Sequence, residues 1–249
     1  MDPPICGSAP AVVGAVSEAP PSRRPRRAPK QQPSPPPKPG SRANQGSRPY
    51  GGESLEDRRI DQRRRLMFSA RDVFAERGYL AASVEEIVAR AHVSRTAFYR
   101  FFESKEDCLV AVYRDGVDRA LLQFRAIGTS DLDAVEKVNS AAATIIRFFG
   151  EDPALARVML IEVVGASPAT QAVRHQARLE FARIVEDAMA ATGLWNKRPK
   201  RERELVAVAT MAAMVETVSH LVAAGRIGEW QSLVDPMGRY ALRALTPEA

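Results

Sequence analysis

Residues 83–107 read SVEEIVARAHVSRTAFYRFFESKED, and they contain two short helical patterns separated by a tight turn. The stretch opens with S-x-x-E, the spacing of a capping box, and its apolar positions share one face, which predicts a helix over residues 83–90. Ser94 is a suitable N-cap for a second helix over residues 94–102. Two short helices joined in this way are typical of a helix-turn-helix, which we place at residues 83–102.

The predicted second helix has one apolar and one polar face. Phe98 and Phe102 are four residues apart and can anchor the helix on a core. Ala97 is small enough to let the backbone approach a groove. Arginine can bind guanine edges, threonine a thymine methyl group or a phosphate, and a tyrosine hydroxyl a phosphate oxygen. This chemistry predicts DNA contacts by the four residues of the polar face: Arg95, Thr96, Tyr99 and Arg100.

Lys105 falls in the first turn of the following predicted helix, which opens at Ser104. The helix dipole makes a cation unfavourable there by a few tenths to about 1 kcal/mol. A phosphate bound at the same helix end would reverse that cost, because the free backbone N–H groups attract anions. We therefore predict a phosphate contact for Lys105. The alternative is that Lys105 points into solvent or pairs with Glu103.

The rest of the chain also has helical periodicity, and no alternating β-branched run predicts a strand. An all-α protein of about nine helices is expected. Pro236 lies inside the last of them and should kink or break it. The predicted helices cover residues 55–77, 83–90, 94–102, 104–128, 131–150, 153–165, 168–192, 200–225 and 230–245.

Charge and proline are unevenly distributed along the 249 residues, whose formal net charge is +6. Residues 1–54 carry a net charge of +5 (8 basic, 3 acidic) and 13 of the 18 prolines, which predicts a disordered basic arm. It is a solvated tail, an arm that adds non-specific DNA affinity, or the result of a start site that truly lies further downstream. Residues 55–105 carry +3 (11 basic, 8 acidic) and form the predicted DNA-binding domain, whereas residues 106–249 carry −2 (17 basic, 19 acidic).

Several classes of site are not supported by the sequence. Cys6 and Cys108 form no disulfide framework or metal-ligand spacing, and Cys108 is expected to be a buried apolar residue. His92, His175 and His220 are scattered, no glycine-rich phosphate loop follows a strand, and no nucleophile motif is present. We expect no enzyme activity, metal or cofactor. No signal peptide or membrane span is expected, which predicts a cytoplasmic, nucleoid-associated protein.

The stretch FAERGYLAASVEEIVARAHVSRTAFYRFFESKEDCLVAVY resembles the DNA-binding domain of the TetR family of bacterial transcriptional regulators, and the matching motif covers about residues 60–120. The resemblance implies that residues 94–100 form the recognition helix, that Tyr99 and Lys105 hold phosphates, and that the start of the preceding helix abuts the DNA backbone. The predicted DNA-binding residues are Ser83, Val84, Ser94, Arg95, Thr96, Ala97, Tyr99, Arg100 and Lys105.

The sequence departs from the family pattern at two positions. His92 stands where the family usually has glycine in the turn, and Phe101 stands where a histidine is frequent. His92 would need a left-handed backbone conformation, at some cost in energy. We interpret it as a turn residue without DNA contact; the alternative is a ring nitrogen that binds a phosphate.

The family implies a ligand pocket and a dimer interface in residues 106–249, which we expect to form one helical domain. The stretch ELVAVATMAAMVETVSHLVAAG is apolar around most of a helix, so it needs cover on two sides, and a second subunit would supply one of them. The predicted interface comprises Met214, Val218, Leu221, Val222, Leu233, Met237, Tyr240 and Ala241.

Methionine and aromatic residues mark the candidate pocket, although at helical spacing such residues also make ordinary core. Glu162, and the pair Glu216 and His220, are polar groups in apolar runs, where they serve either as structural partners or as handles on a ligand. The predicted pocket residues are Phe124, Phe148, Phe149, Met159, Glu162, Phe181, Trp195, Met211 and Met214.

Together these features predict a homodimeric transcriptional regulator that binds double-stranded operator DNA. We expect a repressor that a small, largely apolar ligand releases, because displacement of helices would change the separation of two recognition helices. The alternative is a dimeric DNA-binding regulator or architectural protein without an effector, which a pocket filled by side chains would favour. The sequence does not specify the operator, the effector, the regulated genes or the choice between repression and activation.

Overall fold

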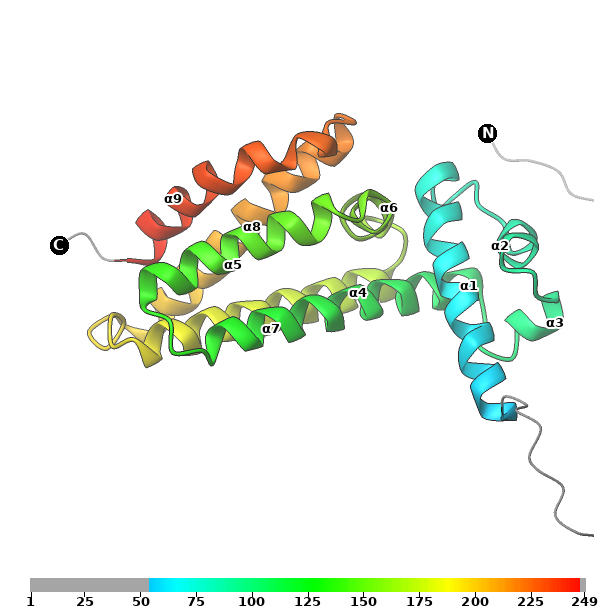
Figure 1. Cartoon of the computed structure of the whole chain (residues 1–249), viewed down its shortest axis with the longest axis horizontal. Coiled ribbons are helices and arrows are strands. Elements are labelled where there is room, and N and C mark those ends of the chain that lie inside the picture. Colours follow the sequence, from blue (N-terminus) through cyan, green and yellow to red (C-terminus); the bar gives the residue numbers. More distant parts are fainter. Residues whose placement is uncertain (1–53, 247–249) are drawn as a thin grey trace, which may run out of the picture. The chain divides into compact units, whose positions relative to one another are not determined.

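The computed structural model describes residues 54–246, and all regular structure in that range is helical (Figure 1). The prediction of an all-α protein is confirmed for these residues; the predicted arm, the question of the start site and Cys6 lie outside them. The elements are α1 (Leu55–Arg77), α2 (Val84–Ala91), α3 (Arg95–Phe98), α4 (Lys105–Gly128), α5 (Ala134–Gly150), α6 (Pro153–Arg157), the π-helix η1 (Val158–Glu162), α7 (Pro168–Ala191), α8 (Lys200–Ala223), the 3-10 helix η2 (Ile227–Leu233) and α9 (Val234–Leu245).

Side-chain caps explain why several helices begin where they do. Ser83 accepts a hydrogen bond from the Glu86 N–H, and the Glu86 carboxylate accepts one from the Ser83 N–H, which completes the predicted capping box. At the start of α4 the Ser104 hydroxyl oxygen accepts a hydrogen bond from the Asp107 N–H. The predicted helix at 131–150 begins later, because Asp133 is its N-cap.

Three predicted helices differ from the observed ones. The helix expected over 94–102 is only four residues long, because hydrogen bonds from the N–H groups of Arg100 and Phe101 to carbonyls three residues earlier tighten the chain. This turn lets both Phe98 and Phe102 be buried, with ring centroids 5.3 Å apart. The helix expected over 153–165 divides into α6 and η1, and the one over 230–245 divides into η2 and α9. The break predicted from Pro236 is confirmed. Pro236 lies in the first turn of α9, where the missing N–H of proline costs no helical hydrogen bond.

His92 ends α2 in the left-handed conformation that the sequence predicted, with φ 53° and ψ 45°. It is the one non-glycine residue with positive φ among the described residues. Its N–H donates to the carbonyls of Val88 and Ala89, so the backbone closes the helix.

Replacing His92 by glycine should raise the free energy of unfolding by about 0.5–1 kcal/mol. A residue with a Cβ costs about 1–2 kcal/mol in the left-handed conformation, and glycine avoids this cost. Part of the gain in stability is lost again, because glycine has more conformational freedom in the unfolded chain. Chemical denaturation of both proteins measures the difference. A less stable glycine variant would show that the imidazole makes a stabilising contact.

The helices form two groups that share one continuous core. Helices α1, α2 and α3 form the first group, and α4 extends from them along the second (Figure 1). In the second group, α7 packs against both α4 and α8, while α5 packs against α9. The core includes Phe74 and Leu109 in the first group and Ala207 in the second, all without exposed surface. Cys108 is also fully buried, as predicted, and burial raises the pKa of its thiol to about 12.

Helix α8 is unusually apolar for its exposure. By length and composition alone it could cross a membrane, with a mean hydropathy of 1.7 over its most apolar window, of which 33% is buried. One such helix is weak evidence for a membrane span, so the expectation of no span is not contradicted. Core helices of soluble proteins pass the same test, and α8 packs on α7 and α9. Its exposed side still lacks cover within the described chain.

Candidate nucleic-acid interface and effector cavity

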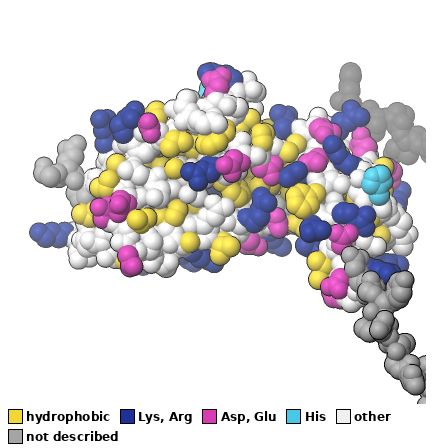
Figure 2. All heavy atoms as spheres, viewed as in Figure 1, with side chains coloured by type: hydrophobic (Ala, Val, Ile, Leu, Met, Phe, Trp, Pro, Cys, Tyr) yellow, Lys and Arg dark blue, Asp and Glu magenta, His cyan; other side chains and the backbone are white. Residues whose placement is uncertain are grey.

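The helix-turn-helix is held by its apolar residues and presents its polar ones to solvent. Ile87 of α2, Phe98 of α3 and Phe74 of α1 are fully buried, and they fix the two short helices on α1. The four residues predicted to face DNA are all exposed: Arg95, Thr96, Tyr99 and Arg100. Figure 2 shows Lys and Arg side chains interspersed with Asp and Glu side chains over α1–α3. Phosphates would therefore have to displace an acidic partner from some of these cations, as at Arg95, which pairs with Glu85.

Two of the exposed residues contact each other. The Arg95 guanidinium lies 5.6 Å from the centre of the Tyr99 ring, and its Nη1 is 2.7 Å from the Glu85 carboxylate. Both members of this ion pair are about two-thirds exposed, at 64% and 60%, so water screens the attraction and DNA can displace it. Arg100 has no ion pair among the described residues and is free to meet a phosphate or a base.

The other residues that were predicted to contact DNA also make contacts within the protein. The Ser83 hydroxyl donates to Glu86 Oε2 over 2.9 Å, and the Ser94 hydroxyl oxygen accepts from the Ala97 N–H over 3.1 Å. Val84 is half-buried beside Ser83 at the start of α2. Ala97 is only 7% exposed, so its methyl group faces the core and not the polar face. The predicted place of Ala97 at the groove is not supported by this geometry.

Lys105 contacts the protein rather than solvent or Glu103. Its Nζ donates to the carbonyl oxygens of Tyr79 and Ala82, each at 2.7 Å, and to that of Leu80 at 3.2 Å. The ammonium also lies 4.7 Å from the centre of the Tyr79 ring. All three N–H donors are therefore used on the turn that precedes α2. The sequence analysis did not consider this role, and a phosphate contact would require Lys105 to leave the turn.

Replacing Lys105 by alanine should lower the free energy of unfolding by about 1–3 kcal/mol, because the turn loses charge-assisted hydrogen bonds. Replacement by arginine is the matched control, since it keeps the charge but changes the donor geometry. Thermal unfolding and a salt titration of DNA binding measure the two roles separately. A variant of wild-type stability whose salt slope falls by about one counterion would restore the phosphate contact as the main role.

An apolar cavity of about 170 Å³ lies between α4, α5, α7 and α8. Six of the nine predicted pocket residues line it: Phe124, Phe148, Phe149, Met159, Phe181 and Met211. The edge-to-face pairs Phe124 with Phe181 and Phe148 with Phe149 shape two of its walls, with centroids 5.3 and 5.2 Å apart. Side chains do not fill this space, and that is the condition under which an effector can bind.

Comparisons with known proteins relate the helix-turn-helix to a known family. Residues 66–112 match the model of the bacterial regulatory proteins of the tetR family. The transcriptional activator FasR of Mycolicibacterium smegmatis is 33% identical over 107 residues, which are 42% of this chain and 49% of FasR. Residues 66–112 therefore carry a DNA-binding domain of the TetR family. The regulator YdgC of Bacillus subtilis is 29% identical over 110 residues, 42% of this chain and 55% of YdgC, so the chain matches about half the length of each relative.

Solved TetR-like structures show the same fold over most of the chain. FadR from Bacillus halodurans has a TM-score of 0.65 at 20% identity and covers 72% of this chain and 97% of its own. FadR from Bacillus subtilis, solved in complex with stearoyl-CoA, has a TM-score of 0.66 at 17% identity and covers 73% and 98%. The family and these relatives are regulators and not enzymes, which confirms the prediction that the chain is not an enzyme. No cluster of His, Cys, Asp and Glu that could hold a metal occurs among the described residues.

Three predicted pocket residues of this chain lie elsewhere. Trp195 is fully buried and its indole N–H donates to the Leu245 carbonyl over 2.7 Å, which makes it a structural link to the end of α9. Met214 lines a smaller adjoining cavity. Glu162 lies at the end of η1, next to the helix-turn-helix, where it is a structural partner and not a ligand handle.

The Glu162 carboxylate connects the two helical groups. Its Oε2 accepts a hydrogen bond from the Tyr79 N–H over 2.8 Å, and its side chain is 11% exposed. Arg157 Nε lies 3.1 Å from Oε1, although outside hydrogen-bonding geometry. Gly78 has a φ of 80°, and a Cβ there would meet the same carboxylate at 3.4 Å. A second link joins Arg71 of α1 to Asp152, the N-cap of α6, over 2.8 Å.

Most of the residues predicted for the dimer interface are buried within one subunit. Met214, Val218, Leu221, Val222, Met237 and Ala241 are each at most 8% exposed. Leu233 is half-buried, and Tyr240 is 42% exposed. The apolar side that these six residues form on α8 and α9 is covered by the subunit's own helices, so they lie away from the free surface of a single subunit, and their place in an interface stays a prediction.

The uncovered side of α8 carries a different stripe. Leu205 is 62% exposed and Val208 is 38% exposed, and Ala209 and Ala212 are exposed on the same side; Ala212 and the charged Glu216 that follows it also border the cavity. These residues recur at three- and four-residue intervals, so they form one face of the helix. An apolar helix side of this length is a candidate subunit interface.

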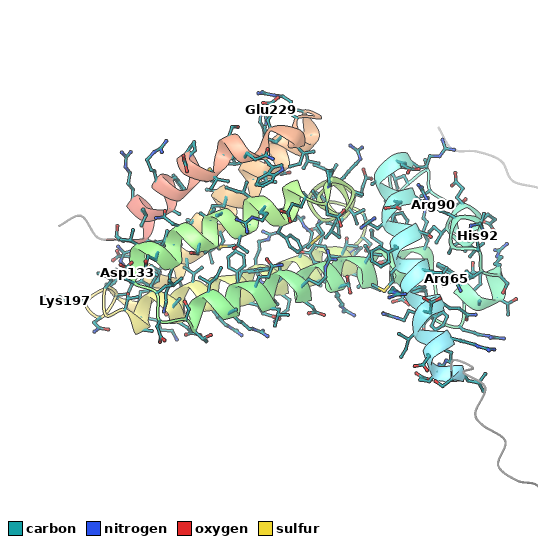
Figure 3. All side chains as sticks on the ribbon, viewed as in Figure 1. Arg65, Arg90, His92, Asp133, Lys197 and Glu229 are labelled. Atoms are coloured by element: carbon teal, nitrogen blue, oxygen red, sulfur yellow. The ribbon has the colours of Figure 1, made fainter. Side chains whose placement is uncertain are left out.

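Sequence reasoning missed a set of arginines on α1. Five of them in its N-terminal half are exposed: Arg58, Arg59, Arg63, Arg64 and Arg65. Arg63 lies 5.7 Å from the Phe102 ring centre, so this part of α1 borders the end of the helix-turn-helix. Figure 3 shows Arg65 on α1 and Arg90 and His92 around α2. The run of arginines in DQRRRLM is the feature of the sequence that indicates this set, but the prediction for this helix used only its apolar periodicity.

The structure also shows where the polar residues Glu216 and His220 lie. Both side chains are exposed on α8, and no hydrogen bond joins them among the described contacts. Glu216 lines the mouth of the cavity, whereas His220 does not. His175 is exposed on α7. The three histidines therefore share no site.

Proposed function

We propose that this protein is a homodimeric TetR-family transcriptional regulator that binds double-stranded operator DNA and is released by a small, largely apolar ligand. The single observation that carries the proposal is the exposed set of Arg95, Thr96, Tyr99 and Arg100 on a helix-turn-helix that shares its core with a cavity-containing helical body. Base edges are read by such side chains from a short helix in the major groove. A protein of this function resides in the cytoplasm with the nucleoid.

The unfilled cavity favours a regulator with an effector over one without. A core built only for stability is packed without voids larger than a water molecule, whereas this cavity of about 170 Å³ is lined by six aromatic and methionine residues of the predicted pocket. The FadR relative of Bacillus subtilis was solved with stearoyl-CoA, which supports a ligand response in this fold. Because FasR is named as an activator, the direction of regulation is a separate question from ligand binding.

The proposed dimer uses the exposed stripe of α8 that begins at Leu205. A two-fold axis would pair each stripe with its copy and give α8 the cover that its composition requires. Two recognition helices would then read two half-sites one helical turn apart, so the operator should be an inverted repeat.

The route from the cavity to DNA runs through η1 in this proposal. Met159 and Leu160 of η1 line the cavity, and Glu162 at its end holds the Tyr79 N–H. Lys105 holds the carbonyl of the same Tyr79. A ligand that moves η1 would therefore pull on the turn that positions α2 and α3.

Replacing Glu162 by alanine should release this turn. The Tyr79 N–H loses its acceptor, which costs about 1–3 kcal/mol, so the amides around Tyr79 should exchange faster and DNA affinity should fall several-fold. Glutamine at position 162 is the matched control, since its carbonyl still accepts the hydrogen bond. Hydrogen exchange and DNA titration on both variants test the route. Unchanged exchange at Tyr79 in the alanine variant would contradict it.

The proposed function itself is tested by selection from random duplexes. The purified chain should enrich a short inverted repeat, and that DNA should bind far more tightly than the unselected pool. The Arg95→Ala, Arg100→Ala double variant is the control, because it keeps the buried core of the helix-turn-helix. Failure of the wild type to enrich any sequence would refute the proposal.

A further inference from the structure

Two arginines line the cavity, and neither makes an ion pair within 4 Å among the described residues. Arg174 and Arg178 lie one turn apart on α7, and both border the cavity. The ion pairs that α7 makes within residues 54–246 use other residues, Glu180 with Arg125 and Glu186 with Arg203. Like charges four residues apart repel on a helix, so this arrangement is unfavourable unless something negative lies nearby.

The surroundings of Arg174 increase that cost. It is partly buried, and its pKa is lowered first by burial and then by the charge of Arg178. The Tyr113 side chain, 8% exposed, faces both guanidiniums from α4. Glu216 is the one carboxylate in the lining, and two cations against one anion leave this end of the cavity with a net charge of +1. A bound anion would relieve both the repulsion and the lost hydration.

A second cavity beside the first is apolar. It has a volume of about 40 Å³, shares the lining residues Phe124 and Met211 with the larger cavity, and lies between α4, α5, α7, α8 and α9. Lys137 borders it, but its Nζ donates to the Gly128 carbonyl over 3.0 Å, so the cation is already engaged. The rest of the lining is almost entirely hydrocarbon, including Ile184, Val185 and Met189. The two cavities therefore adjoin at Phe124 and Met211; the larger one carries the two arginines, and the lining of the smaller one is almost entirely apolar.

We infer that the effector is a straight-chain acyl compound with an anionic head group, which lies at Arg174 and Arg178 while its chain runs past Phe124 and Met211 toward Ile184. A bulky planar molecule fits less well, because a cavity of about 170 Å³ is below the usual size for drug-sized ligands, whereas a slim chain can occupy both spaces. The inference rests on the proposed function of this cavity as the effector site, and it goes further by naming the class of ligand.

The test compares three probes that share one chain: laurate, lauroyl-CoA and methyl laurate. Isothermal titration of the full chain, without DNA and below the micellar concentration, should show tighter binding of the anions than of the neutral ester. The shared chemistry has two sources, a carboxylate or the phosphates of coenzyme A. Binding of laurate assigns the carboxylate, and binding of lauroyl-CoA alone assigns the phosphates; either supports the inference.

The matched variants separate the head from the chain. Arg174→Gln with Arg178→Gln should weaken binding of the anionic probe by about tenfold or more and leave methyl laurate unchanged. Arg183→Gln, an exposed arginine of α7 outside the lining, is the control and should bind like the wild type. Ala188→Phe should fill the apolar end and weaken laurate while sparing hexanoate. Circular dichroism confirms that each variant is folded.

Two results would overturn the inference. One is equal affinity of the double arginine variant and the wild type for the anionic probe. The other is an absence of binding by laurate and lauroyl-CoA to the folded wild type. The proposed function fails separately: if an acyl anion binds but operator affinity does not change, the inference stands and the ligand response does not. If another small molecule releases the DNA and no acyl anion binds, the response stands and the inference does not.

Discussion

Val208→Arg is expected to convert the dimer into a folded monomer and to lower operator affinity by about 100-fold or more. Val208 is 38% exposed on the uncovered side of α8, so the arginine can reach solvent in a single subunit. In the dimer it would place two like charges in a dry, apolar contact, which costs far more. A monomer binds one half-site at a time, and the loss of the second contact removes the avidity of the pair.

Light scattering and DNA titration measure the two effects. The subunit mass is 27.3 kDa, so the wild type should give about twice that value and Val208→Arg the single mass. Leu122→Arg is the matched control, since Leu122 is 71% exposed on α4 and lies outside the α8 stripe. A monomeric wild type at micromolar concentration would contradict the dimer, and a dimeric Val208→Arg would move the interface elsewhere.

Met214→Arg distinguishes the proposed interface, on the exposed stripe of α8, from the interface predicted from the sequence. Met214 is 4% exposed inside the subunit, so a buried charge at this position should unfold the chain, whatever the subunits do. The sequence did not distinguish the two sides of α8, because a helix that is apolar all round has no phase that marks its inner face. That information comes from α7 and α9, which cover the side containing Met214.

Much of the helix-turn-helix could be predicted because its signals are local. The capping box at Ser83, the four-residue spacing of Phe98 and Phe102, and the left-handed His92 all depend on neighbours within a few residues. The length of α3 could not be predicted in this way. Its early end reflects the burial of Phe102, a tertiary effect that overrides the periodicity of residues 94–102.

The role of Lys105 was hidden for a related reason. Its partners, the carbonyls of Tyr79, Leu80 and Ala82, lie more than twenty residues earlier in the chain. Backbone acceptors leave no trace in side-chain patterns, so a lysine in the first turn of α4 offers only its charge as a clue. Glu162 is similar, because its partner is the N–H of Tyr79. In contrast, the aromatic pocket residues were found because their size and spacing are visible in the sequence.

Arg95→Ala and Arg100→Ala should differ in how they affect specific and non-specific binding. Loss of a bidentate guanine contact should cost about 1–3 kcal/mol on the operator and much less on random DNA. Arg95 is the better candidate for base reading, because it begins α3 whereas Arg100 lies in the turn beyond its end. Tyr99→Phe is the control for a phosphate contact and should weaken binding to both DNAs about equally.

The ion pair of Arg95 supplies a further variant with the opposite sign. Glu85 holds the Arg95 guanidinium at 2.7 Å and adds a negative charge to the DNA-binding face, so Glu85→Gln should strengthen binding to random DNA, most of all at low salt. Fluorescence anisotropy over a salt series, on the selected operator and on random DNA, measures all four variants. Suppose that Arg95→Ala and Arg100→Ala lower affinity for both DNAs in equal proportion. Neither arginine would then read a base, and sequence recognition would pass to Thr96 and to the shape of the DNA.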